Sequence, residues 1–149
     1  MQKVLFAVGV AALVCVACKG APSFVGKWKM KPGTSSILKG DQKQAAQMFE
    51  GSSIEITKEK AFVWTLPYGG MQVPITGTWT DGGEKITIKL ATIQGQPLET
   101  VSASMPEGAQ KKAFNNLMQP MTISSGENGE IKMQSAIPNA PVFFLTKSE

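Results

Sequence analysis

The sequence predicts a mainly β protein: an antiparallel meander of about eight strands closing into a barrel, with two short helices. Short segments in which apolar and polar residues alternate recur from residue 24 onward, and Gly- or Pro-containing turns separate them. Alternation at period two is typical of strands that bury one face. The inward faces are uniformly aliphatic or aromatic, which favours one sheet wrapped round one core. An open sheet with both helices on one face is the alternative, but closure removes the unpaired edges of a long meander.

The first strand is expected at residues 24–31, where Trp28 and Met30 alternate with lysines. Pro32 and Gly33 end it. Residues 41–50 are rich in helix formers, with a capping aspartate at the start and a glycine stop directly afterwards, so they predict the first helix.

The remaining strands are expected where apolar residues alternate between turns. They cover residues 54–57, 62–66, 73–79, 86–90, 121–123, 131–133 and 142–146. Residues 92–105 fit no single pattern, and we expect an edge strand over residues 98–103. The second helix is expected over residues 107–118, since Pro106 suits a helix start and Pro120 ends it.

Residues 1–17 have the layout of a secretory signal peptide, with Lys3 followed by an apolar run from Val4 to Ala17. The run is shorter than the roughly 20 helical residues that cross a bilayer. A buried N-terminal helix is the alternative, but such a helix carries polar residues at a 3.6 period. Residues 4–17 carry none.

The end of this run, Cys15-Val16-Ala17-Cys18, resembles the lipobox of bacterial lipoproteins. The resemblance implies cleavage before Cys18 and acyl chains, such as palmitate, on its thiol. Ordinary cleavage near Ala21 is the alternative. We therefore expect a signal peptide at 1–17, a lipidated tether at 18–23 and a barrel domain at 24–149. The protein is then expected in the cell envelope, held on a membrane, and on the outer one where the host has two, because Lys19 rather than Asp follows the cysteine.

The composition excludes several kinds of chemistry. The chain has no His and no Arg, all fifteen cationic residues are lysines, and both cysteines lie in the N-terminal segment. His is the usual general base near neutral pH, and Arg is the preferred bidentate partner of phosphate. A His/Cys metal site cannot be built either. We expect no enzyme activity, no cofactor, no metal and no nucleic-acid partner, and we expect a monomer.

Two Gly-x-Trp phrases carry a resemblance to small bacterial lipocalin-like lipoproteins. The first is Phe24-Val25-Gly26-Lys27-Trp28. The second is Gly77-Thr78-Trp79, followed by a glycine turn and Lys85-Ile86-Thr87-Ile88. The resemblance spans most of residues 24–147, although the late-strand Arg that packs on the first Trp in true lipocalins is absent. It implies a barrel with an interior calyx and an apolar ligand.

The candidate functional residues form two sets. Inward-facing residues expected to wall an apolar cavity are Trp28, Phe62, Trp64, Ile75, Trp79 and Ile88. Their alternative role is to fill the core, since an eight-stranded barrel is just wide enough to be filled or to hold one small ligand. Tyr68 and Met71, in a glycine-containing loop, are the candidate contact loop, with a packed hairpin as the alternative. The function expected is a membrane-anchored carrier of a small apolar or lipid-like ligand. The alternative is a filled β-domain acting in protein–protein interaction or envelope assembly.

Overall fold

The computed structural model describes residues 23–31, 49–138, 140 and 142–148. Two short helices and nine strands lie within these ranges. The helices are α2 (Leu98–Ser104) and α3 (Ala109–Leu117). The strands are β1 (Gly26–Met30), β2 (Ser53–Ile56), β3 (Ala61–Tyr68), β4 (Met71–Asp81), β5 (Lys85–Ile93), β6 (Gln96–Pro97), β7 (Met121–Ser125), β8 (Ile131–Ser135) and β9 (Val142–Lys147).

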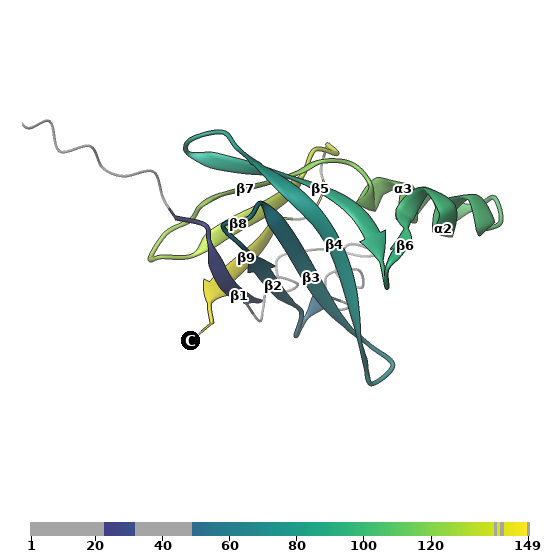
Figure 1. Ribbon diagram of the computed structural model, residues 1–149, viewed down its shortest axis with the longest axis horizontal. Coiled ribbons are helices and arrows are strands. Elements are labelled where there is room, and N and C mark those ends of the chain that lie inside the picture. The colour runs from purple at the N-terminus through teal and green to yellow at the C-terminus, as the bar shows by residue number, and fades with distance from the viewer. Residues whose placement is uncertain (1–22, 32–48, 139, 141, 149) are drawn as a thin grey trace, which may run out of the picture.

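The strands form a closed antiparallel barrel (Figure 1). The sheet order is β4-β3-β2-β1-β9-β8-β7-β5-β6, and β4 also pairs with β5, which closes the ring. Eight strands make the barrel, and the two-residue β6 is an extra strand on β5. The prediction of a closed barrel rather than an open sheet is confirmed.

The core lies inside the barrel and follows the predicted alternation. On β3, for example, Phe62 and Trp64 are buried, while Val63 and Thr65, which alternate with them, are only half-buried. On β5 the buried residues are Ile86, Ile88 and Leu90. Burial of one face of every barrel strand removes a large apolar area from water, and this is the main stabilising term for such a domain.

The two ends of the barrel are built differently, as Figure 1 shows. One end carries the start of β1 and three tight turns, at residues 57–60, 82–84 and 126–130. We call it the tether end, because the described chain enters there at Ser23. The opposite end carries residues 49–52, the β3–β4 hairpin and both helices, and we call it the helix end.

A β-bulge in β5 interrupts the alternation of apolar and polar residues after residue 90. Gly77 pairs with Leu90, but Thr76 pairs with Thr92, so Ala91 is an extra residue. One extra residue reverses which side chains face inward. The inward positions therefore change from Leu90 to Ile93, and a single alternating pattern cannot extend across this point.

The edge strand expected over residues 98–103 is wrong, because this segment is helix α2. A turn at Gln94 and Gly95, both with positive φ, reverses the chain into the short β6, and α2 starts directly after Pro97. Leu98 and Ser102, four residues apart, are its buried residues. That is helical spacing, which the β-branched Thr100 and Val101 obscured in the sequence.

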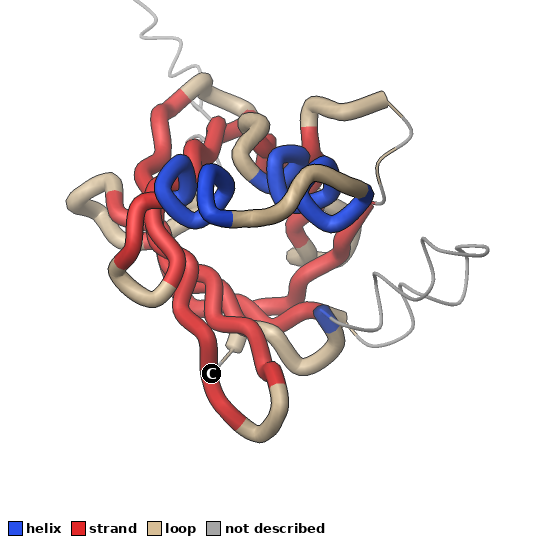
Figure 2. The backbone as a smooth tube through the Cα atoms, turned by 90° about the vertical axis from the view of Figure 1, so that its right-hand side faces the viewer, coloured by secondary structure: helices blue, strands red, loops and turns tan. Residues whose placement is uncertain are grey.

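Helix α3 confirms the helix expected over residues 107–118. Figure 2 shows both helices lying across one end of the barrel. Phe114, Leu117 and Met118 are partly buried and pack on the core, but no residue of α3 is fully buried. Helix α3 therefore packs less tightly on the core than the barrel strands do. Most of the helix expected at 41–50 lies outside the described residues.

Within the described residues, no helix is long and apolar enough to cross a membrane. The signal peptide expected at 1–17 and the lipid site expected at Cys18 lie outside the described residues.

Candidate binding site inside the barrel

All six residues of the predicted cavity wall lie in one buried cluster. Trp28, Phe62, Trp64, Ile75, Trp79 and Ile88 are each at most 8% exposed. The strand register places several side by side, since Trp64 pairs with Ile75 across β3 and β4, and Trp79 pairs with Ile88 across β4 and β5. The sequence prediction that these side chains point inward is confirmed, whereas the presence of a cavity between them stays a prediction.

Trp28 and Trp79, one from each Gly-x-Trp phrase, both donate an indole hydrogen bond to a backbone carbonyl oxygen. The indole Nε1 of Trp28 donates to the carbonyl oxygen of Phe24 at 2.9 Å. The indole Nε1 of Trp79 donates to the carbonyl oxygen of Thr57, also at 2.9 Å. Both partners lie at the tether end, so these two indoles are fixed there by their polar atoms. A buried Trp normally satisfies its N–H in this way.

A lysine covers each of these two rings. The Nζ atom of Lys60 lies 3.6 Å from the ring centroid of Trp79, and that of Lys147 lies 6.0 Å from the centroid of Trp28. Both lysines are exposed, and a cation over an aromatic ring at such a site contributes about 0.5–1 kcal/mol. Lys147 on the last strand therefore places a cation near the first Trp, Trp28. The chain has no Arg that could do so. Neither lysine could be identified from the sequence, because contacts between neighbouring strands that are distant in the sequence leave no local signal.

Trp64 differs from the other two tryptophans. Its side chain is 1% exposed, and its indole Nε1 has no hydrogen-bond partner. Leaving a buried donor unsatisfied costs about 1–3 kcal/mol. Native proteins rarely accept this cost without a compensating role or an additional molecule at the site.

Phe49 links two walls of the barrel next to Trp64. Its ring centroid is 5.1 Å from that of Trp64 on β3 and 5.4 Å from that of Phe143 on β9. These strands are separated in the barrel by β2 and β1. Phe49, which comes just before β2, therefore lies at the helix end between the two rings. The sequence placed Phe49 within the helix expected at residues 41–50 and did not indicate this role.

The buried hydroxyl groups beside the core have partners. Ser52 Oγ donates to the sulfur of Met30 at 3.7 Å, and Ser102 Oγ on α2 donates to Asn115 Oδ1 on α3 at 2.5 Å. The second bond links the two helices. The Thr57 hydroxyl lies beside Glu59 in the turn after β2 and not at the helix end.

The predicted contact loop is a tight hairpin with two exposed apolar side chains. Tyr68 ends β3 and Met71 begins β4, so the turn itself is just Gly69 and Gly70. Tyr68 and Met71 are cross-strand partners and are 65% and 60% exposed. The alternative of a hairpin with a packed Tyr is therefore wrong.

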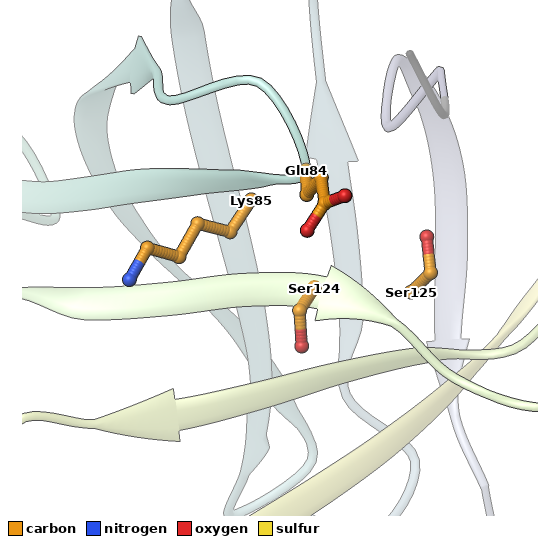
Figure 3. A pocket seen from close by; sticks show the side chains of 4 residues that line it. All are labelled: Glu84, Lys85, Ser124 and Ser125. Atoms are coloured by element: carbon orange, nitrogen blue, oxygen red, sulfur yellow. The ribbon is translucent and has the colours of Figure 1, made fainter. Parts of the chain in front are cut away.

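A shallow surface pocket of about 410 Å³ lies between β5 and β7 at the tether end, lined by Glu84, Lys85, Ser124 and Ser125. In Figure 3 the Lys85 side chain extends away from the Glu84 carboxylate. This lining is polar and mixed in charge, and it shares no residue with the predicted apolar site.

The described residues hold no group of three or more His, Cys, Asp or Glu side chains that could bind a metal ion. One carboxyl has a shifted pKa. The backbone amide of Glu59, followed by the Thr57 hydroxyl, lowers the pKa of the Glu59 side chain. This direction stabilises a surface carboxylate, whereas a general acid needs a raised pKa.

Comparisons with known proteins add no family. No family model matches the chain, and no curated protein or solved structure matches it.

Proposed function

We propose that this chain is an exported lipoprotein, anchored through Cys18, whose barrel binds a small apolar or lipid-like molecule. One observation carries the binding proposal: the described barrel interior is apolar, two hydrogen-bonded indoles lie at its tether end, and helix α3, one of the two helices across the helix end, has no fully buried residue. Apolar sites with a few polar groups are typical of small-molecule binding. The route of entry is at the helix end, beside α3.

Titration of the purified protein with fatty acids and their methyl esters of increasing chain length tests the binding. The three tryptophans line the interior, so bound ligand should change their fluorescence. An Ile75→Phe variant, which adds volume inside the barrel, should weaken binding. Thr80→Phe makes the same kind of addition on an exposed position of the same strand and is the control. Absence of a fluorescence change at every chain length, for acids and esters alike, would contradict the proposal.

The anchor is tested by a matched pair of cysteine variants. Cys18→Ser should move the protein from the membrane fraction to the soluble fraction, whereas Cys15→Ser should leave it on the membrane. Two or more acyl chains give stable anchoring, so the change should be nearly complete. If the Cys18→Ser protein still fractionates with membranes, an uncleaved Val4–Ala17 segment is the better account.

A second function, contact with another envelope protein, is favoured by the exposure of Tyr68 and Met71. Their hairpin lies at the helix end, whereas Ser23 enters at the opposite end. Only residues 19–22 separate Cys18 from Ser23, and an extended chain spans at most about 3.6 Å per residue. An anchored barrel would thus hold its tether end near the bilayer and point the hairpin away from it, where a protein partner is the natural contact.

Site-specific photocrosslinking in cells tests this contact. A photoreactive side chain at position 68 should give a discrete adduct, and one at Gly83, in an exposed turn at the tether end, should not. Equal labelling from both positions would contradict a specific contact.

A further inference from the structure

We propose that the indole N–H of Trp64 is the hydrogen-bond donor that selects the ligand, and that the ligand is a neutral molecule with an apolar chain and a carbonyl oxygen, such as an ester. This inference rests on the binding function proposed above. It adds the polar group that the ligand must carry and the charge that it must lack.

The first argument is the contrast among the three tryptophans. Trp28 and Trp79 each donate to a backbone carbonyl oxygen at 2.9 Å, while Nε1 of Trp64 has no partner although the side chain is 1% exposed. The protein therefore satisfies this group twice in the same core and leaves it free once. A donor left free in an apolar interior favours any molecule that brings an acceptor, because binding then removes the cost of the unsatisfied group.

The second argument is the position of Trp64. It contacts Phe49 at the helix end, where helix α3 has no fully buried residue. The two fixed indoles hydrogen-bond to carbonyl groups at the tether end. A molecule that enters between the helices and the strands therefore reaches Trp64 and Phe49 before it reaches the other two indoles.

The third argument concerns charge. Among the described residues, every buried side chain is apolar or a serine, and no lysine is buried. Of the described lysines, Lys60 and Lys147 lie over Trp79 and Trp28, and none is recorded over Trp64. A carboxylate placed next to Trp64 would lose its hydration without gaining a counter-ion from the described residues, and this is costly. A neutral carbonyl oxygen accepts the same hydrogen bond without that cost.

The test is a cycle of two proteins and three probes. The proteins are wild type and Trp64→Phe, and the probes are a medium-chain methyl ester, the alkane with the same number of heavy atoms and the corresponding fatty acid at neutral pH. Wild type should bind the ester about tenfold more tightly than the alkane, as expected for one buried hydrogen bond, and should bind the acid more weakly than the ester. Trp64→Phe should lose the preference for the ester and keep its affinity for the alkane. Thr65→Val, which removes a hydroxyl donor from the other face of the same strand, is the matched control and should keep the preference.

The indole N–H signals in a proton–nitrogen correlation spectrum give a readout independent of affinity. The signal that Trp64→Phe deletes should move downfield with the ester and stay in place with the alkane. If ester and alkane bind both proteins alike, or if the Trp64 N–H is bonded to a buried water that the ester does not displace, the inference is overturned while the binding function stands. If no probe binds wild type, both are overturned.

Discussion

Substituting Gly77 by Ala is expected to destabilise the barrel, against the usual effect of this change. Gly77 lies on β4 opposite Leu90, next to the bulge at Ala91. A Cβ atom there would lie 2.3 Å from the carbonyl oxygen of Lys89 and 2.9 Å from Cα of Leu90. Both are backbone atoms, so no side chain can rotate to make room, and the two strands must separate by about 1 Å to restore ordinary van der Waals contact.

The magnitude follows from two opposing effects. At an ordinary φ, Gly→Ala stabilises a protein by about 0.4–1 kcal/mol, because it restricts the unfolded chain. Overpacking of a tightly packed site costs about 1–3 kcal/mol, and each strained ladder hydrogen bond adds about 1 kcal/mol. With one strained hydrogen bond, the net loss is about 1–4 kcal/mol, which corresponds to a fall in Tm of about 10 °C for a domain of this size at the middle of that range.

Thermal unfolding and urea unfolding of the purified protein measure this loss. Gly70→Ala is the control, because Gly70 has φ +79° and no atom within 4 Å of the added Cβ. It introduces backbone strain without a clash and should cost about 1 kcal/mol. A Gly77→Ala protein as stable as wild type, or more stable, would refute the close approach of β4 and β5 on which the reasoning depends.

Three further predictions concern the tryptophans and the hairpin. Trp79→Phe should lower the free energy of unfolding by about 1–2 kcal/mol in urea titrations, because it leaves the Thr57 carbonyl oxygen without its donor; Trp64→Phe, which breaks no hydrogen bond, should cost clearly less, and equal losses would contradict the distinction between them. Lys147→Met should lower stability by about 0.5 kcal/mol through loss of the cation over Trp28, with Lys132→Met, whose Nζ is 5.9 Å from the exposed-side ring of Phe144, as a comparison on the neighbouring strand; a gain in stability would contradict it. The double variant Tyr68→Ser, Met71→Ser should leave Tm within about 2 °C of wild type, because both side chains are exposed, and should reduce binding of an apolar fluorescent dye to the native protein; a large fall in Tm would show that the hairpin is part of the core.

Most of the barrel could be predicted from the sequence, because its strands alternate regularly. Where one face is buried and the other wet, period-two alternation specifies both the strand and its inward side. β3 and β5 follow this rule through Phe62, Trp64, Ile86 and Ile88. A different period, the 3.6-residue spacing of apolar residues, predicted helix α3.

The segment after the bulge could not be predicted by the same reasoning. The extra residue at Ala91 depends on the close approach of β4 and β5, and nothing local in the sequence marks it. Once the phase has changed, the β-branched residues of α2 look like a strand, although burial of Leu98 and Ser102 makes the segment a helix. Tertiary packing overrode local propensity there.

The sequence predicted which tryptophans point into the barrel but not which of them have hydrogen-bond partners. Strand parity places Trp28, Trp64 and Trp79 on the inward face, and it treats the three residues alike. Which indole finds a partner depends on the carbonyl groups of Phe24 and Thr57, and these are positioned by the turns at the tether end. Hydrogen bonding therefore separates Trp64 from the other two only in three dimensions.

The two ends of the barrel are therefore expected to differ in how substitutions affect the protein. At the tether end, each indole is held by a hydrogen bond and covered by a lysine, so substitutions there should change stability first. At the helix end, Phe49 is half-buried, helix α3 has no fully buried residue and Trp64 keeps an unused donor. Substitutions there should change binding more than stability, because regions with few fully buried contacts open at the lowest cost in free energy.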